Sequence, residues 1–321
     1  MISFLKKNDG LLVIIAPVLL VLSSIFNGMA NPSLFILNTG FSAIGELFGL
    51  DTLIANRLVQ GIITVVVALV AMIFVNRVIA NNSLLGRLSN MPLIVCAILF
   101  GIIPAEFQNV LFWVTMLLYV QFITTLLSCL LEHKVFNSVF NAGFILGMLV
   151  LIYPMYILLF IPLIGVLIIN STINLRLTII ATLGVSTPIY VCVALLYILA
   201  PSKLAEFVSQ IYLNFSLEFV AGGIEKYILA IVVLLSVVVE GLNSRFITMR
   251  EKRIWRFEMI LLFSSFLVLF TEYSVGIMAL ALVPSIIILS RALINSKNNR
   301  ISQLLFITLI LSVAINIALS L

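Results

Sequence analysis

Long apolar runs separated by short polar segments make up most of this chain. Eleven of these runs have the length and hydrophobicity of full or shortened membrane helices, so the pattern predicts an all-α polytopic transmembrane bundle. Spans and connections occupy the whole length, which predicts one transmembrane domain over residues 1–321 and no separate soluble domain. In chain order the predicted spans are Leu11–Phe26, Leu58–Val78, Pro92–Ile103, Val110–Leu131, Phe140–Ile152, Met155–Ile169, Leu177–Leu199, Tyr227–Leu242, Phe257–Phe270, Val275–Leu289 and Leu304–Leu321.

The central run Asn141–Asn170 contains no charged residue. As a single helix it would be about 45 Å long, half again the roughly 30 Å of a bilayer's hydrocarbon core. Pro154 stands near its middle, and proline removes a backbone donor and clashes with the preceding helical turn. We therefore expect two short helices, Phe140–Ile152 and Met155–Ile169, joined as a tight hairpin.

The composition excludes a soluble protein. Hydrophobic residues make up 63% of the chain and charged residues 9%, whereas soluble domains carry about 25% charge. The bilayer is therefore the expected solvent. The three cysteines, Cys96, Cys129 and Cys192, fall inside apolar runs and are expected to be buried. With one histidine, His133 in a polar linker, and no CxxC pair, no zinc or haem site is indicated.

The basic residues predict the orientation of the bundle. Threading eleven spans from a cytoplasmic N-terminus leaves only Arg57, Lys203 and Lys226 outside, as the positive-inside rule requires. The net charge of +5 follows from this topology, so no nucleic-acid partner is indicated. Lys6, Lys7 and the run after them resemble a secretory signal, but the predicted orientation needs this first span. The remaining basic residues fall inside: Lys6, Lys7, Arg77, Arg87, Lys134, Arg176, Arg245, Arg250, Lys252, Arg253, Arg256, Arg291, Lys297 and Arg300.

The outer side carries most of the acidic residues and two long connections, Asn27–Asn56 and Pro201–Lys226. Both connections mix apolar and polar residues in the manner of short interfacial helices, and with the outer turns they could form a cleft at the membrane surface. In the first connection, Glu46 or Asp51 is a candidate general base or ligand of a divalent metal. Arg57 is a candidate for binding a lipid phosphate.

Other charged residues are open to more than one interpretation. Glu106, in the turn after Pro104, is a candidate supporting carboxylate facing a water-filled cavity, and the alternative is an acid that simply lies at the membrane interface. The candidates of the first outer connection also fit an ordinary solvated loop followed by a helix cap. Glu240 is interpreted as a structural partner of Arg245. The basic segment Asn243–Arg256 fits an anionic-lipid or partner-docking patch, or simple enforcement of topology.

Several functional classes lack their signatures. The chain has no GxSxG, HExxH, phosphate-binding loop or dinucleotide fingerprint. No group of ionisable residues is expected inside the membrane, which disfavours a proton-coupled pump. Two matching helices broken by glycine or proline are also missing, which weakens a transporter built from inverted repeats.

Two resemblances to known families extend these expectations. Residues 140–190, with FNAGFILGMLVLIYPMYILLFIPLIGVLII followed by Arg176 and GVSTPIY, resemble a family of polytopic inner-membrane proteins from Bacteroidota. Some members of that family carry a beta-carotene monooxygenase label. The resemblance implies a bacterial inner membrane and no established activity.

The layout is also similar to that of the GT-C glycosyltransferases. The shared features are an outer loop with interfacial helices, an arginine opening the second span and a short central hairpin. Those enzymes use polyprenyl-phosphate sugars and an acidic residue soon after the first span. Here Asn27 and Asn31 occupy that place, and the first acid is Glu46.

These observations leave two main functions and a third. The first is a GT-C-like transferase of envelope biogenesis that uses lipid-linked sugar at the periplasmic face, with Glu46, Asp51, Arg57 and Glu106 in the roles given above. The second is a non-catalytic membrane subunit of an envelope assembly or secretion complex. The third is a small-molecule transporter. Membrane lipids, a polyprenyl-phosphate-linked sugar and other membrane subunits are the expected partners.

Overall fold

Every regular element in the described part of the chain is helical, which confirms the predicted all-α class. The structure is a computed structural model. It describes residues 9–30, 57–86, 88–100, 110–131, 135–170, 174–202, 204, 207, 224–243, 248–271, 277–295 and 299–320. The helices are α2 (Asp9–Ala30), α5 (Arg57–Asn81), α6 (Met91–Phe100), α7 (Val110–Leu131), α8 (Val135–Ile152), η2 (Pro154–Leu159), α9 (Phe160–Ile169), α10 (Leu175–Leu199), α12 (Ile224–Asn243), α13 (Met249–Thr271), α14 (Ile277–Asn295) and α15 (Asn299–Ser320).

Pro154 interrupts the central apolar run as predicted. Helix α8 ends at Ile152, and Tyr153 has extended backbone angles, φ −138° and ψ 117°. The chain then forms the 3₁₀ helix η2, with Pro154 at its start, before α9 begins. Tyr153 is buried and packs edge-on against Tyr156, with ring centroids 5.5 Å apart, so it belongs to the core.

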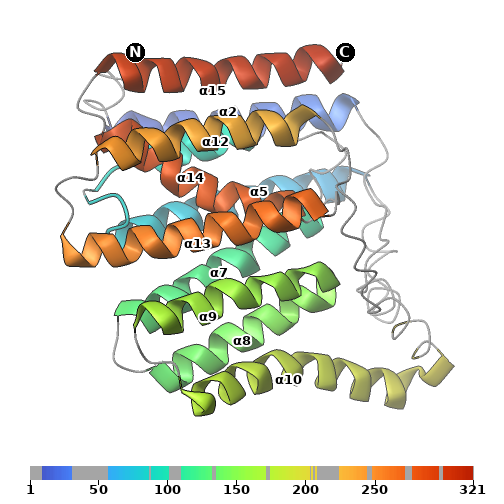
Figure 1. The fold of residues 1–321 in the computed structure, drawn as a ribbon. Coiled ribbons are helices and arrows are strands. Elements are labelled where there is room, and N and C mark those ends of the chain that lie inside the picture. Colours follow the sequence, from blue (N-terminus) through green and yellow to red (C-terminus); the bar gives the residue numbers. More distant parts are fainter. Residues whose placement is uncertain are drawn as a thin grey trace.

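The helices lie side by side with their axes roughly aligned, and the two ends of the chain are at opposite ends of the bundle (Figure 1). Several contacts fix which helix ends lie together. Asp9, at the start of α2, accepts a hydrogen bond from the backbone N–H of Asn90, just before α6. Asn170, at the end of α9, donates to the carbonyl of Cys129 near the end of α7. We refer to this end, where α2 begins, as the N-terminal end of the bundle.

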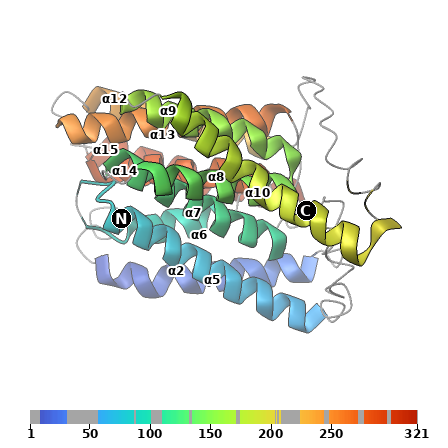
Figure 2. The same cartoon turned by 90° about the horizontal axis from the view of Figure 1, so that it is seen from below.

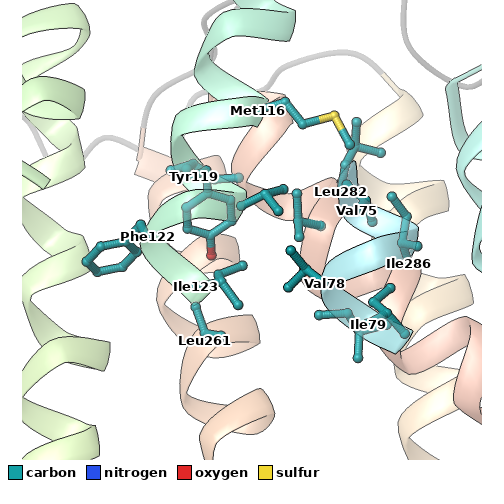
Figure 3. Close-up of a cluster of buried hydrophobic side chains, with 14 of the residues drawn as sticks. Val75, Val78, Ile79, Met116, Tyr119, Phe122, Ile123, Leu261, Leu282 and Ile286 are labelled. Atoms are coloured by element: carbon teal, nitrogen blue, oxygen red, sulfur yellow. The ribbon is translucent and has the colours of Figure 1, made fainter. Parts of the chain in front are cut away.

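Helix α14 forms the centre of the bundle. All of its side chains from Leu280 to Ile294 are buried, and it contacts α6, α7, α12, α13 and α15. Figure 3 shows the neighbouring core, where Leu282 and Ile286 of α14 meet side chains of α5 and α7. There the hydroxyl of Tyr119 is 2.8 Å from Ser265 Oγ on α13.

Helices α8 and α10 approach each other more closely than side chains normally permit. A Cβ atom added to Gly143 would lie 2.5 Å from the carbonyl oxygen of Ala181, and one added to Gly184 would lie 2.6 Å from that of Phe140. Gly147, four residues after Gly143, would collide with α10 in the same way. This is the small-xxx-small packing by which membrane helices gain close backbone contact.

The apolar helices indicate a membrane protein. Among the described residues, three helices are long and apolar enough to cross a membrane: Ile62–Asn81, Phe112–Leu131 and Leu175–Leu199. Shorter apolar helices accompany them, including Phe136–Ile152, Pro154–Ile169 and Leu280–Asn295. Large apolar side chains are widely exposed on the outer helices, as expected for a surface that lipid covers.

Candidate functional site

Three of the four residues predicted to carry chemistry, Glu46, Asp51 and Glu106, lie outside the described residues. Arg57 is the first residue of α5, as predicted, and its side chain is not among those described. His133 also lies outside the described residues. The structure therefore describes the helices on either side of the predicted site residues, α2, α5, α6 and α7.

Those helices are neighbours. Glu46 and Asp51 fall between α2 and α5, and Glu106 falls between α6 and α7. Helix α2 packs on α6 and α5, and α5 packs on α6 and α7. In Figure 2 the blue and teal ribbons of α2, α5 and α6 lie next to one another. The two connections thus join four helices that form one contacting group.

An aromatic cluster holds the adjoining ends of α6 and α7 together. Phe100, the last residue of α6, lies 4.8 Å from Trp113 of α7 between ring centroids, and Phe112 packs edge-on against Trp113 at 5.2 Å. Trp113 is 1% exposed, and its indole N–H has no acceptor among the described residues. The three rings therefore fix the end of α6 against the first turn of α7.

The N-terminal end of the bundle contains a buried charge cluster that the pattern of the sequence did not predict. It consists of Glu240 of α12, Glu258 of α13 and Arg291 of α14. Arg291 donates through Nη1 to Glu258 Oε2 at 2.5 Å, and its Nε lies 3.4 Å from Glu240 Oε1. All three side chains are less than 9% exposed.

A backbone carbonyl completes the binding of Arg291. Its Nε donates to the carbonyl of Leu84 at 2.9 Å, and Nη2 donates to the same oxygen. Leu84 follows α5 in a Schellman turn, where its N–H bonds to the carbonyl of Ile79 and that of Ser83 bonds to Ala80. Ser83 takes the left-handed backbone conformation that this turn requires, with φ 53°. The turn therefore directs the Leu84 carbonyl toward the guanidinium.

The charge cluster bears on two expectations. Glu240 was interpreted as a structural partner of Arg245, which lies outside the described residues; among the described residues its partner is Arg291. No group of ionisable residues was expected inside the membrane, and the structure shows three of them buried together inside the bundle at this end. Arg291 was expected in a polar linker, but α14 continues to Asn295 and buries it. Two carboxylate oxygens, Glu240 Oε2 and Glu258 Oε1, are buried without a described partner.

A second polar group joins the beginnings of α2 and α6. The carboxylate of Asp9 accepts hydrogen bonds from the Ser89 hydroxyl at 2.9 Å and from the Asn90 backbone and side-chain amides. Asn90 in turn accepts from the side-chain amide of Asn76 on α5 at 3.1 Å. These bonds satisfy exposed N–H groups at the start of α6 and fix three helices to one another.

The described residues provide no evident metal centre. They contain no group of three or more His, Cys, Asp or Glu side chains placed to hold an ion. Cys96, Cys129 and Cys192 are buried, as predicted, and form no disulfide with one another. Comparison with known protein families, characterised proteins and solved structures finds no match to this chain.

Proposed function

We propose that this chain is an eleven-span inner-membrane protein of envelope biogenesis that transfers sugar from a lipid carrier at its periplasmic face. Its N-terminus is cytoplasmic and its C-terminus periplasmic. Glu46 or Asp51 serves as general base or as ligand of a divalent metal, and Glu106 supports it. Arg57 binds the phosphate of the polyprenyl carrier, because a guanidinium offers two parallel donors to a phosphate.

The observation that carries this proposal is the grouping of α2, α5, α6 and α7. The connections that contain Glu46, Asp51 and Glu106 join these four helices, of which α2, α5 and α6 pack on one another and α7 packs on α5, and Arg57 begins one of them. Helices α2 and α6 both begin at the N-terminal end, where Asp9 bonds to Asn90, so both run toward the opposite end of the bundle. This arrangement supports a shared site for residues that are far apart in the sequence.

The distribution of charge supports the orientation. The basic residues Arg77, Arg176 and Arg256 all belong to helix segments near the N-terminal end, where α5 ends and α10 and α13 begin. Arg176 lies over the ring of Phe136, so α8 and α10 also begin together there. By the positive-inside rule this end faces the cytoplasm, which supports a site on the opposite, periplasmic side.

A second candidate function, a non-catalytic subunit of an envelope complex, is favoured by α10. This helix makes its extensive contact with α8, through the glycines described above. Its other face is open, with Tyr190 76% and Ile198 74% exposed. A long apolar helix at the edge of a bundle is suited to packing against another membrane protein as well as against lipid.

The two functions predict different responses to isosteric substitution of the acids. Glu46→Gln, Asp51→Asn and Glu106→Gln would be introduced singly, with Glu218→Gln in the other long connection as the matched control. Growth and the profile of envelope glycans would be compared with those of a deletion strain, after membrane levels of each variant are confirmed. The proposal expects at least one of the three variants to reproduce the deletion while the control resembles wild type.

If the deletion has a phenotype and all three variants behave as wild type, the catalytic proposal is refuted. A subunit role then predicts that substitutions on the open face of α10, such as Tyr190→Ala with Ile198→Ala, reproduce the deletion instead. Co-purification from membranes, compared between wild type and this pair of substitutions, would identify the partner.

A further inference from the structure

An apolar groove runs along the outside of the bundle between α9 and α13. It has a volume of about 540 Å³ and is lined by Ile161, Ile164, Gly165, Ile168, Met259, Ile260 and Phe263. The two helices lie next to each other in both views of the bundle (Figures 1 and 2). Gly165 contributes to the depth of the groove, because a Cβ atom there would lie 3.0 Å from the side chain of Ile260.

The groove continues directly into a basic helical turn. Arg256 precedes Met259, Ile260 and Phe263 by three, four and seven residues, and Lys252 precedes Arg256 by four, so both basic residues share a face of α13 with the groove. Lys252, Arg253 and Arg256 are all exposed, and the described residues include no carboxylate paired with any of them.

The position of these basic side chains favours binding of an anion. They occupy the first two turns of α13, where the partial positive charge of the helix end disfavours basic side chains. Glu251, the acid in that turn, is engaged in a capping box: it accepts from the backbone N–H of Thr248 at 2.7 Å and from its hydroxyl. Both of these hydrogen bonds of its carboxylate are thus to Thr248, and no ion pair joins Glu251 to these cations among the described residues.

We infer that the α9–α13 groove and the basic turn bind one anionic phospholipid of the leaflet at the N-terminal end of the bundle. Lys252 and Arg256 bind the phosphate, Arg253 stands at the edge of the headgroup, and an acyl chain lies in the groove. Arg256 and Phe263 are seven residues apart, about 10 Å along a helix, which is less than the roughly 15 Å of hydrocarbon in one leaflet. The lipid therefore belongs to a single leaflet. This site is independent of the proposed sugar transfer, which lies at the other end of the bundle.

The test uses the full-length protein purified in detergent, with phosphatidylglycerol and phosphatidylcholine of identical acyl chains as probes. Native mass spectrometry measures how much of each lipid stays bound. We expect wild type to retain phosphatidylglycerol preferentially. Each of Lys252→Gln and Arg256→Gln should weaken that retention about fivefold, the effect of one basic side chain at an anionic surface. Arg250→Gln is the matched control, because Arg250 is exposed in the same turn but faces away from the groove.

The acyl-chain half of the site is tested separately. Gly165→Leu fills the groove from α9, and Ile168→Trp fills it from a position that is already 56% exposed and leaves the backbone packing intact. Both should abolish retention of phosphatidylglycerol while the basic turn is unchanged. Equal retention of the two lipids would overturn the anionic headgroup assignment. Equal losses in Arg250→Gln and Arg256→Gln, or full retention in Ile168→Trp, would show only diffuse surface attraction and overturn the site.

Discussion

Two flanks of this bundle are held by opposite means. On one flank, α10 attaches through α8 by close contact between glycine and backbone atoms, with no ion pair among the described residues there. On the other flank, α12 and α13 are joined to the central helix α14 by the buried ion pairs of Glu240 and Glu258 with Arg291. Both flanks face the same difficulty, because burying apolar surface gives no advantage between helices that lipid already surrounds.

The difference lies in how much each contact can tolerate. A packing contact between small residues depends on shape, and its strength is distributed over many weak atomic contacts. A buried charge cluster depends on a few atoms, and removing one partner leaves the others unpaired in a medium of low dielectric. The α8–α10 flank should therefore respond to added volume, and the α12–α14 flank to lost charge.

Arg291→Met should have the largest effect. It leaves two buried carboxylates and the Leu84 carbonyl without their donor, and breaking a buried pair costs about 3–5 kcal/mol of unfolding free energy. Denaturant unfolding in detergent measures the loss. Arg250→Met, an exposed arginine of α13, is the control and should change stability little.

The same cluster offers a rescue. Combining Arg291→Met with Glu240→Leu and Glu258→Leu removes every charge, and buried ionic groups replaced together by apolar ones are often tolerated. The triple variant should therefore recover much of the stability that the single variant loses. If Arg291→Met unfolds like Arg250→Met, the charge cluster does not hold this flank.

Gly147→Ala should have the next largest effect. Its methyl group would meet the Val185 carbonyl and lie 2.5 Å from Cγ of Pro188, so α10 must move outward. Overpacking of this kind costs about 1–3 kcal/mol. Gly10→Ala, where no atom lies within 4 Å of the added group, is the control. Hydrogen exchange should accelerate in α10 and stay unchanged in α14; equal acceleration in both would contradict the separation of the two flanks.

Tyr119→Phe should have the smallest effect on stability. It removes one hydrogen bond between α7 and α13. Ser265 donates to the Leu261 carbonyl, so the Tyr119 hydroxyl is the donor in its 2.8 Å hydrogen bond with Ser265. Side-chain hydrogen bonds between membrane helices contribute about 0.6 kcal/mol on average. The melting temperature should fall slightly relative to Tyr190→Phe, an exposed tyrosine of α10. A fall as large as that of Gly147→Ala would assign this bond a greater role.

Hydropathy predicted the helices well and their ends less well. The predicted limits of α7 are those observed, and the break at Pro154 is confirmed because proline acts through local backbone chemistry. Helix α13 begins eight residues before its predicted start, since the capping box of Thr248 and Glu251 lies in a segment interpreted as a basic connection. A charged first turn is invisible to a hydropathy criterion.

The charge cluster could not be predicted for a different reason. Arg291 is 33 positions from Glu258 and 207 positions from Leu84 in the sequence. The periodicity of a single helix cannot predict contacts between residues so far apart. The α8–α10 contact did leave a local signal, since Gly143 and Gly147 are four residues apart, as in membrane-helix dimers. The catalytic candidates Glu46, Asp51 and Glu106 stay predictions, because they lie outside the described residues.

The central position of α14 has a consequence for biosynthesis. Chains are made from the N-terminus, so Glu240 and Glu258 are translated before Arg291. Until then the helix around which α6, α7, α12, α13 and α15 pack is incomplete. A chain that ends before residue 291 contains both acids without the arginine that pairs with them. The core around α14 can therefore close only after about nine-tenths of the 321 residues have been made.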